Sequence, residues 1–125
     1  MAEEKVFTVN TEPAVKLTAR DIDDIMCTAL EGGVSFWCDE AKVVGKYLGG
    51  FASDQISRGG KLLLFAEHTP HELTLDKFLD GMRKYISDGE PVTVDADGNI
   101  DTCDIDAIMA DMIVQYAVFG EVIYS

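Results

Sequence analysis

The stretch that decides the fold is KLLLFAEHTPHELTLDKFLDGMRKYIS, residues 61–87. Its first six residues, 61–66, form a short apolar run that is typical of a buried strand. Residues 72–75 are expected to pair back with this strand across a turn at 68–71. Over residues 76–87 the apolar side chains recur at helical spacing, which predicts an amphipathic helix. An antiparallel strand pair followed directly by a helix indicates the α+β class.

The segments that precede this unit extend the same class. Residues 5–9 alternate between polar and apolar side chains, as a short strand does. Residues 18–30 carry apolar side chains at helical spacing, and Thr18 or Asp21 can cap that helix. Residues 34–37, Val-Ser-Phe-Trp, predict a further strand.

The segments that follow residue 87 predict a hairpin and a last helix. The hairpin is expected over residues 91–101, turned at Asp95-Ala96-Asp97-Gly98. The helix is expected from 104 to 118, and residues 121–124 are expected to form a final strand. Together these segments predict one α+β domain over residues 1–125, with three amphipathic helices packed on short, mostly antiparallel strands.

The first and last helices share a phrase, DIDDIM at residues 21–26 and DIDAIM at residues 104–109, an offset of 83 residues. Duplication of a strand-to-helix unit would produce this similarity. Convergence would also produce it, because Asp at a helix start and Ile or Met on a buried face are common choices. True repeats usually extend over about 20–50 residues, and both interpretations stay open at this point.

Composition sets the broad class of the protein. The chain has 125 residues, of which 47% are hydrophobic and 26% are charged, as expected for a globular domain. No apolar run approaches the roughly 20 residues that span a bilayer, and the acidic start predicts no secretory signal. The three cysteines, at 27, 38 and 103, form no disulfide framework. We therefore expect reduced thiols, a cytoplasmic protein and no membrane partner.

The charge is strongly negative and unevenly distributed. There are 23 acidic and 10 basic residues, for a net charge of -13. This balance argues against direct binding of nucleic acid or of an anionic membrane. Residues 1–84 hold 14 acids and all 10 bases, whereas residues 85–125 hold nine acids and no Lys or Arg. The acidity is thus concentrated in the hairpin and the last helix.

This concentration predicts an anionic surface for partner binding. Its candidate residues are Asp95, Asp97, Asp101, Asp104 and Asp111, the last two being two helical turns apart and away from the Ile and Met stripe. Carboxylates spaced over a rigid face would occupy a basic groove of a nucleic-acid-binding host protein, as a mimic of nucleic acid. The alternative is that the acidic face only keeps the protein in solution.

A second hypothesis concerns the glycine-rich segment, residues 45–61. Arg58, Gly59, Gly60 and Lys61 place two cations around two glycines, whose backbone N–H groups could approach an anion such as a nucleotide. The spacing is not that of a P-loop, and tight turns before a buried strand explain the same glycines.

Other chemistry has weaker support, and we expect no metal and no cofactor. Asp95, Asp97 and Asp104 fall on ligand positions of a calcium loop, but Thr93 stands at its first position, which requires a carboxylate. The two histidines lie in the turn at 68–71, away from the cysteines, and a solvated loop explains them. Because no residues stand out as nucleophile and base, a small enzyme is only a third hypothesis. The 47% hydrophobic content leaves room for an apolar interface between copies of the chain, so a homo-oligomer is compatible with the sequence.

The chain also resembles a family of small, acidic, uncharacterised proteins carried by phages and mobile elements of gut Firmicutes. The resemblance covers nearly the full length and is carried by residues 29–33 (ALEGG), 52–60 (ASDQISRGG), 73–81 (LTLDKFLDG) and 104–124. It implies an accessory or counter-defence role, in which small acidic inhibitors such as anti-CRISPR proteins are common, and it assigns no catalytic residue. Our leading hypothesis is therefore a non-enzymatic inhibitor that binds a basic host protein.

Overall fold

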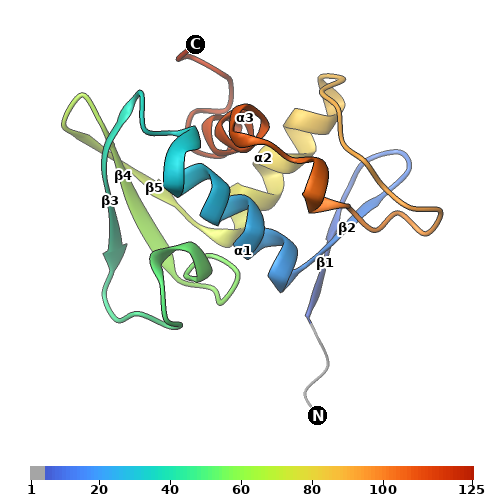
Figure 1. Cartoon of the computed structure of the whole chain (residues 1–125), viewed down its shortest axis with the longest axis horizontal. Coiled ribbons are helices and arrows are strands. Elements are labelled where there is room, and N and C mark those ends of the chain that lie inside the picture. Colours follow the sequence, from blue (N-terminus) through green and yellow to red (C-terminus); the bar gives the residue numbers. More distant parts are fainter. Residues whose placement is uncertain (1–4) are drawn as a thin grey trace.

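The computed structural model describes residues 5–125 of the chain. This part contains two antiparallel sheets and three α-helices, joined by turns and irregular segments (Figure 1). The smaller sheet pairs β1 with β2, and the larger has the strand order β3-β4-β5. The strands are β1 (Val6–Val9), β2 (Val15–Thr18), β3 (Cys38–Val44), β4 (Lys61–Ala66) and β5 (Thr69–Leu73). The helices are α1 (Ala19–Thr28), α2 (Leu75–Ser87) and α3 (Ala107–Phe119). The predicted α+β class is confirmed.

The helices lie between the two sheets in the view of Figure 1, with α3 seen nearly end-on beside α2. Hydrophobic side chains from both sheets and all three helices form one buried cluster. Within it Ile22 of α1, Leu64 of β4 and Phe78 of α2 are fully buried. Burial of apolar surface in this cluster is the main favourable term that holds the elements together.

Helix α1 begins and ends as its residues dictate. Thr18 Oγ1 accepts a hydrogen bond from the Asp21 N–H at 3.1 Å, and Asp21 Oδ2 accepts one from the Thr18 N–H at 2.8 Å. This reciprocal capping box satisfies two donors at the helix start. The helix continues into a single π-helical turn, Ala29–Gly33, after which the chain turns sharply. The predicted strand at 34–37 is therefore wrong, since the strand begins only at Cys38.

The β4–β5 hairpin confirms the predicted strand at 61–66 and corrects the predicted turn. Only Glu67 and His68 form the turn, both with positive φ (50° and 64°), so that β5 starts at Thr69. A two-residue turn with both φ values positive matches the right-handed twist of the flanking strands. Because neither residue is Gly, Asn or Asp, the residue types did not indicate this turn.

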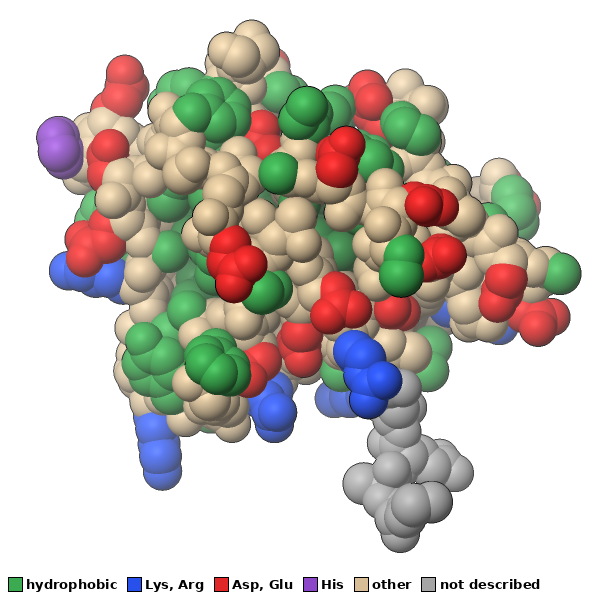
Figure 2. Space-filling view, in the orientation of Figure 1, with side chains coloured by type: hydrophobic (Ala, Val, Ile, Leu, Met, Phe, Trp, Pro, Cys, Tyr) green, Lys and Arg blue, Asp and Glu red, His purple; other side chains and the backbone are tan. Residues whose placement is uncertain are grey.

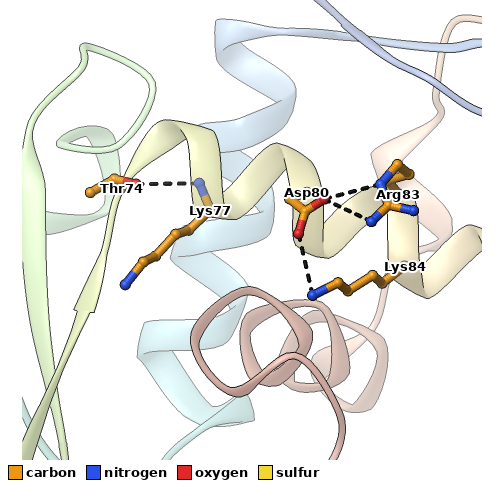
Figure 3. Close-up of polar contacts among 5 residues, drawn as sticks. All are labelled: Thr74, Lys77, Asp80, Arg83 and Lys84. Carbon is orange, nitrogen blue, oxygen red and sulfur yellow. Dashed lines mark hydrogen bonds and ion pairs between the residues drawn. The ribbon is translucent and has the colours of Figure 1, made fainter.

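Helix α2 begins one residue earlier than predicted, at Leu75. It is capped by Thr74, whose Oγ1 accepts a hydrogen bond from the Lys77 N–H at 3.2 Å. Figure 3 shows Asp80 facing Arg83 and Lys84 one turn along the helix. Arg83 donates to Asp80 Oδ1 from both Nε (3.0 Å) and Nη2 (2.9 Å), and Lys84 Nζ lies 3.3 Å from Oδ2. The hydrogen bonds from Arg83 are the main cause of the lowered pKa of Asp80. Being half exposed, these pairs add little stability.

The last third of the chain is less regular than predicted. The hairpin reduces to a single bridge between Val94 and Ile100, and residues 102–104 form a short 3-10 turn. Helix α3 starts at Ala107 rather than at 104, because Asp106 Oδ1 accepts from the Met109 N–H at 2.8 Å and caps it. Residues 121–124 form no strand.

The repeated phrase does not correspond to a structural repeat. Asp21 lies inside α1, whereas its counterpart Asp104 lies in the 3-10 turn before α3. Ile25 is buried, but its counterpart Ile108 is 72% exposed. The two segments pack differently, which favours convergence over duplication.

Candidate functional site

Four of the five predicted acidic residues lie exposed on the surface between β2 and α3. Asp95 organises its own turn, since its carboxylate accepts from the backbone N–H groups of Asp97 (2.8 Å) and Asn99 (3.0 Å) and from the Asn99 side chain (3.2 Å). The hydrogen bonds from Asn99 are the main reason why the pKa of Asp95 lies below its ordinary value. Asp95 and Asp97 therefore sit on a defined turn.

Helix α1 contributes a carboxylate to the same surface. Thr102 Oγ1 donates to Asp24 Oδ2 at 3.2 Å, which ties the 3-10 turn to α1. Asp101, Asp104 and Asp24 surround the exposed Cys103. The pKa of the Cys103 thiol is raised mainly by a hydrogen bond with Asp101, and the negative charges of the three carboxylates raise it further. We define the acidic face as Asp24, Asp95, Asp97, Asp101 and Asp104.

The acidic face carries little compensating charge. None of its five carboxylates makes an ion pair within residues 5–125. In Figure 2 acidic side chains spread across the centre and right of the molecule and also lie along its upper left edge, whereas Lys and Arg side chains lie mostly toward the lower and left edges. This arrangement leaves a negative potential that reaches into the solvent.

Asp111 does not belong to this face, which corrects the fifth predicted residue. It is only 5% exposed, and its Oδ1 accepts from Trp37 Nε1 at 2.6 Å. Gln115 Nε2 donates to both carboxylate oxygens at 3.0 Å. The helical face that carries Asp111 is covered by the segment around Trp37, while Ile108 on the predicted apolar stripe is exposed.

Gln115 links Asp111 to the end of the chain. Its Nε2 also donates to the Tyr124 carbonyl at 2.9 Å, and its Oε1 accepts from the backbone N–H groups of Ile123 and Tyr124, both at 2.9 Å. These partners fix the orientation of the amide group. Its oxygen faces two N–H donors and its NH2 group faces three acceptor oxygens, so a flipped amide would lose all of these bonds. The side chain thereby holds residues 123–124 against α3 without any strand pairing.

Aromatic packing holds the same segment in place. The ring of Trp37 stacks on that of Tyr124, with centroids 5.6 Å apart and an interplanar angle of 5°. Phe119 meets the Trp37 ring edge-on at 5.3 Å. Offset stacking and edge-to-face contacts of this kind are favourable beyond the area they bury.

An apolar pocket of about 550 Å³ opens next to this network. It lies between the π-helical turn, the start of α3 and the end of the chain, and Asp111 is its one acidic lining residue. The lining consists of Gly32, Gly33, Phe36, Ala107, Ile108, Asp111, Met112, Val122, Tyr124 and Ser125. Hydrophobic side chains also gather over this region in the upper part of Figure 2. The size is in the range of small-molecule sites.

Burial raises the pKa of Asp111 above its ordinary value of 3.8, although the hydrogen bonds from Trp37 and Gln115 act in the opposite direction. Because the folded protein binds this proton more tightly than the unfolded chain, ionisation of Asp111 lowers stability. The contribution of Asp111 to stability is thus complete below the unfolded pKa and is lost as the pH rises through the folded pKa. Carboxyl NMR titration is expected to place the midpoint of Asp111 above that of Asp95. A lower midpoint for Asp111 would contradict this assignment.

The glycine N–H groups of the predicted anion loop are already bonded within the protein. The Gly60 N–H donates to the Gln55 carbonyl at 2.9 Å and the Gly59 N–H to the Ile56 carbonyl at 3.0 Å. Lys61 Nζ lies 3.8 Å from Glu72, and Arg58 acts on the carboxylate of Asp23. Arg58, Gly59, Gly60 and Lys61 are adjacent in the chain. The two glycine N–H groups are taken by backbone carbonyls and Lys61 faces Glu72, whereas the exposed Arg58 makes no ion pair within residues 5–125.

Sequence reasoning missed the network of Trp37, Asp111 and Gln115. One signal could have pointed to it: Asp111 and Gln115 stand one helical turn apart inside the otherwise apolar run from Ala110 to Tyr116. Two polar side chains on one face of such a run are typical of a buried polar contact. The third member, Trp37, is 74 residues away and could not be assigned from spacing.

Neither a metal centre nor a membrane helix occurs in the part of the chain that the structure describes. Within residues 5–125 no three His, Cys, Asp or Glu side chains are placed to hold a metal ion. Over the same residues, none of the helices has the length and apolarity to cross a membrane. No protein-family model, no curated protein and no solved structure matches this chain.

Proposed function

We propose that this chain is a non-enzymatic interaction protein that presents the acidic face to a basic surface of a nucleic-acid-binding host protein. The observation that supports it is the arrangement of Asp24, Asp95, Asp97, Asp101 and Asp104. These exposed carboxylates come from three segments, and none is neutralised by an ion pair within residues 5–125. Acidic surfaces of this kind accelerate association with basic partners and suppress binding to anionic ones.

The cellular setting of the proposal rests on the resemblance to phage and mobile-element proteins. In that setting the partner is a host nucleic-acid enzyme in the cytoplasm, and the chain acts as a counter-defence inhibitor. Self-association is disfavoured at long range, because each copy carries a net charge of -13. The nucleotide-binding alternative has less support, since the N–H groups of Gly59 and Gly60 are already bonded to backbone carbonyls.

Charge reversal tests the proposal with a matched control. In the test variant Asp97, Asp101 and Asp104 become lysine; in the control the exposed Glu40, Glu67 and Glu72, on and beside the β3–β4–β5 sheet, become lysine. Both variants change the net charge equally. Partners captured from host lysate at low salt are identified, and their affinities for the purified chain are measured against salt concentration.

The expected result is a basic nucleic-acid-binding protein whose affinity falls steeply with salt. Affinity should drop about a hundredfold in the acidic-face variant and only a few-fold in the sheet variant, with both melting temperatures close to that of the parent. Equal losses in the two variants would mean that total charge, and not this face, drives binding. Retained binding in the acidic-face variant would reject the proposal.

A further inference from the structure

The apolar pocket beside Asp111 is lined by segments that other contacts hold in place. Its floor forms where Gly33 meets α3 closely: a methyl group on the Gly33 Cα would lie 2.6 Å from the Ala107 carbonyl oxygen. Its far wall is the segment of residues 122–124, which Gln115 holds by three hydrogen bonds. The walls are therefore fixed by packing and buried polar contacts before any ligand arrives.

The walls of the pocket are mostly apolar, and Asp111 is the one acidic side chain among them. Phe36 and Ile108 of the lining are 58% and 72% exposed, so that apolar surface is accessible to a ligand there. Asp111 lies in the wall at 5% exposure, and no Lys, Arg or His of residues 5–125 forms an ion pair with it. A buried carboxylate without a cation is costly, because hydrogen bonds from neutral donors replace only part of its hydration.

The hydrogen bonding of Asp111 leaves room for one more donor. Its Oδ1 accepts from Trp37 and Gln115, whereas Oδ2 accepts only from Gln115 within the described residues. A carboxylate can accept about four hydrogen bonds in all. Oδ2 therefore has capacity for a donor that enters from the pocket.

One face of the Tyr124 ring is covered by Trp37, but Phe36 is exposed in the same lining. Its aromatic ring favours a cation over a neutral donor, because the faces of such rings attract positive charge. The net charge of -13 adds a long-range attraction for cations. We propose that this pocket binds a small molecule with an apolar body and a protonated amine, whose ammonium group pairs with Asp111. This site is independent of the acidic face, so either proposal can fail without the other.

The single tryptophan of the chain provides a direct readout. Trp37 is the only source of an indole N–H resonance, and its Nε1–H donates to Asp111. An ammonium group that pairs with Asp111 will shift this resonance. We choose three probes with the same phenylethyl body: phenethylamine, phenethyl alcohol and hydrocinnamate, which carry a positive, a neutral and a negative group.

Two variants locate the site. A side chain at Gly32 meets nothing within 4 Å and enters open space at the pocket, so Gly32→Leu is expected to obstruct it without disturbing the Asp111 network. Gly50→Leu is the matched control, because Gly50 also faces open space and lies outside the pocket. Asp111→Asn removes the charge and keeps the shape of the side chain.

The expected result is a saturable shift of the indole resonance with phenethylamine, and an affinity about tenfold or more above that for phenethyl alcohol. Hydrocinnamate should not bind. Gly32→Leu should abolish binding, Gly50→Leu should retain it, and Asp111→Asn should remove the preference for the amine. The proposal is overturned by the absence of a saturable shift with phenethylamine. Equal affinities for the amine and the alcohol, or unchanged binding in Gly32→Leu, would overturn it as well.

Discussion

Replacing Gln115 with leucine is expected to lower the free energy of unfolding by about 3 kcal/mol. The amide group makes hydrogen bonds to Asp111, to the Tyr124 carbonyl and to the N–H groups of Ile123 and Tyr124. Leucine has a similar size but can replace none of these bonds. Asp111 would keep only the donor on Trp37, and an incompletely bonded buried carboxylate is among the most destabilising changes in a protein interior.

Urea denaturation of Gln115→Leu measures this loss, and hydrogen exchange of the Tyr124 amide reports the release of the terminal segment. Met112→Leu is the matched control, because it changes a half-buried neighbour on the same helix with nearly the same volume. That variant should lose less than about 1.5 kcal/mol. A loss below about 1 kcal/mol for Gln115→Leu, or unchanged exchange of the Tyr124 amide, would mean that the terminal segment is held by other contacts.

Gly81→Ala is expected to destabilise the protein by about 2 kcal/mol, against the usual preference of a helix for alanine. Gly81 is buried in α2 where it crosses α3. A methyl group on its Cα would lie 2.6 Å from the Ala117 backbone N and 2.8 Å from the Ala117 Cβ. Because the obstacle is backbone, α2 and α3 must separate to admit the methyl group, which disturbs the packing of both helices.

Thermal or urea unfolding of Gly81→Ala should be compared with that of Gly32→Ala. The second position faces open space, so the same substitution should leave stability unchanged or raise it by up to about 1 kcal/mol. The two variants thus separate helix propensity from packing. Equal effects of the two substitutions would show that α2 and α3 tolerate a wider spacing.

The helices and the central hairpin were predictable because their signals are local. Residues 76–87 show helical spacing of apolar side chains, and residues 61–66 form an apolar run of strand length. Both elements appear within a few residues of the expected bounds. The strand expected at 34–37 failed because Trp37 is not part of a sheet; its side chain instead packs toward α3 and bonds to Asp111.

Most residues of the acidic face could be predicted from the sequence, but its full set of residues could not. Four of the predicted residues are exposed as expected, because they lie in turns before a helix and such turns lie on the surface. They are Asp95, Asp97, Asp101 and Asp104. Asp24 joins them through a hydrogen bond across 78 residues, which no spacing along the chain reveals. Asp111 is not part of the acidic face, because the segment around Trp37 covers the side of α3 on which Asp111 lies.

Local residue patterns were therefore sufficient for the α+β class, for the position of the main helices and for the concentration of negative charge toward the C-terminus. Each depends on neighbours along the chain or on composition. The burial of Asp111, the clamp made by Gln115 and the apolar pocket depend instead on which side of α3 is covered. That choice is made by contacts between residues far apart in the chain, such as Trp37 with Asp111 and Gly33 with Ala107, and only the folded structure brings them together.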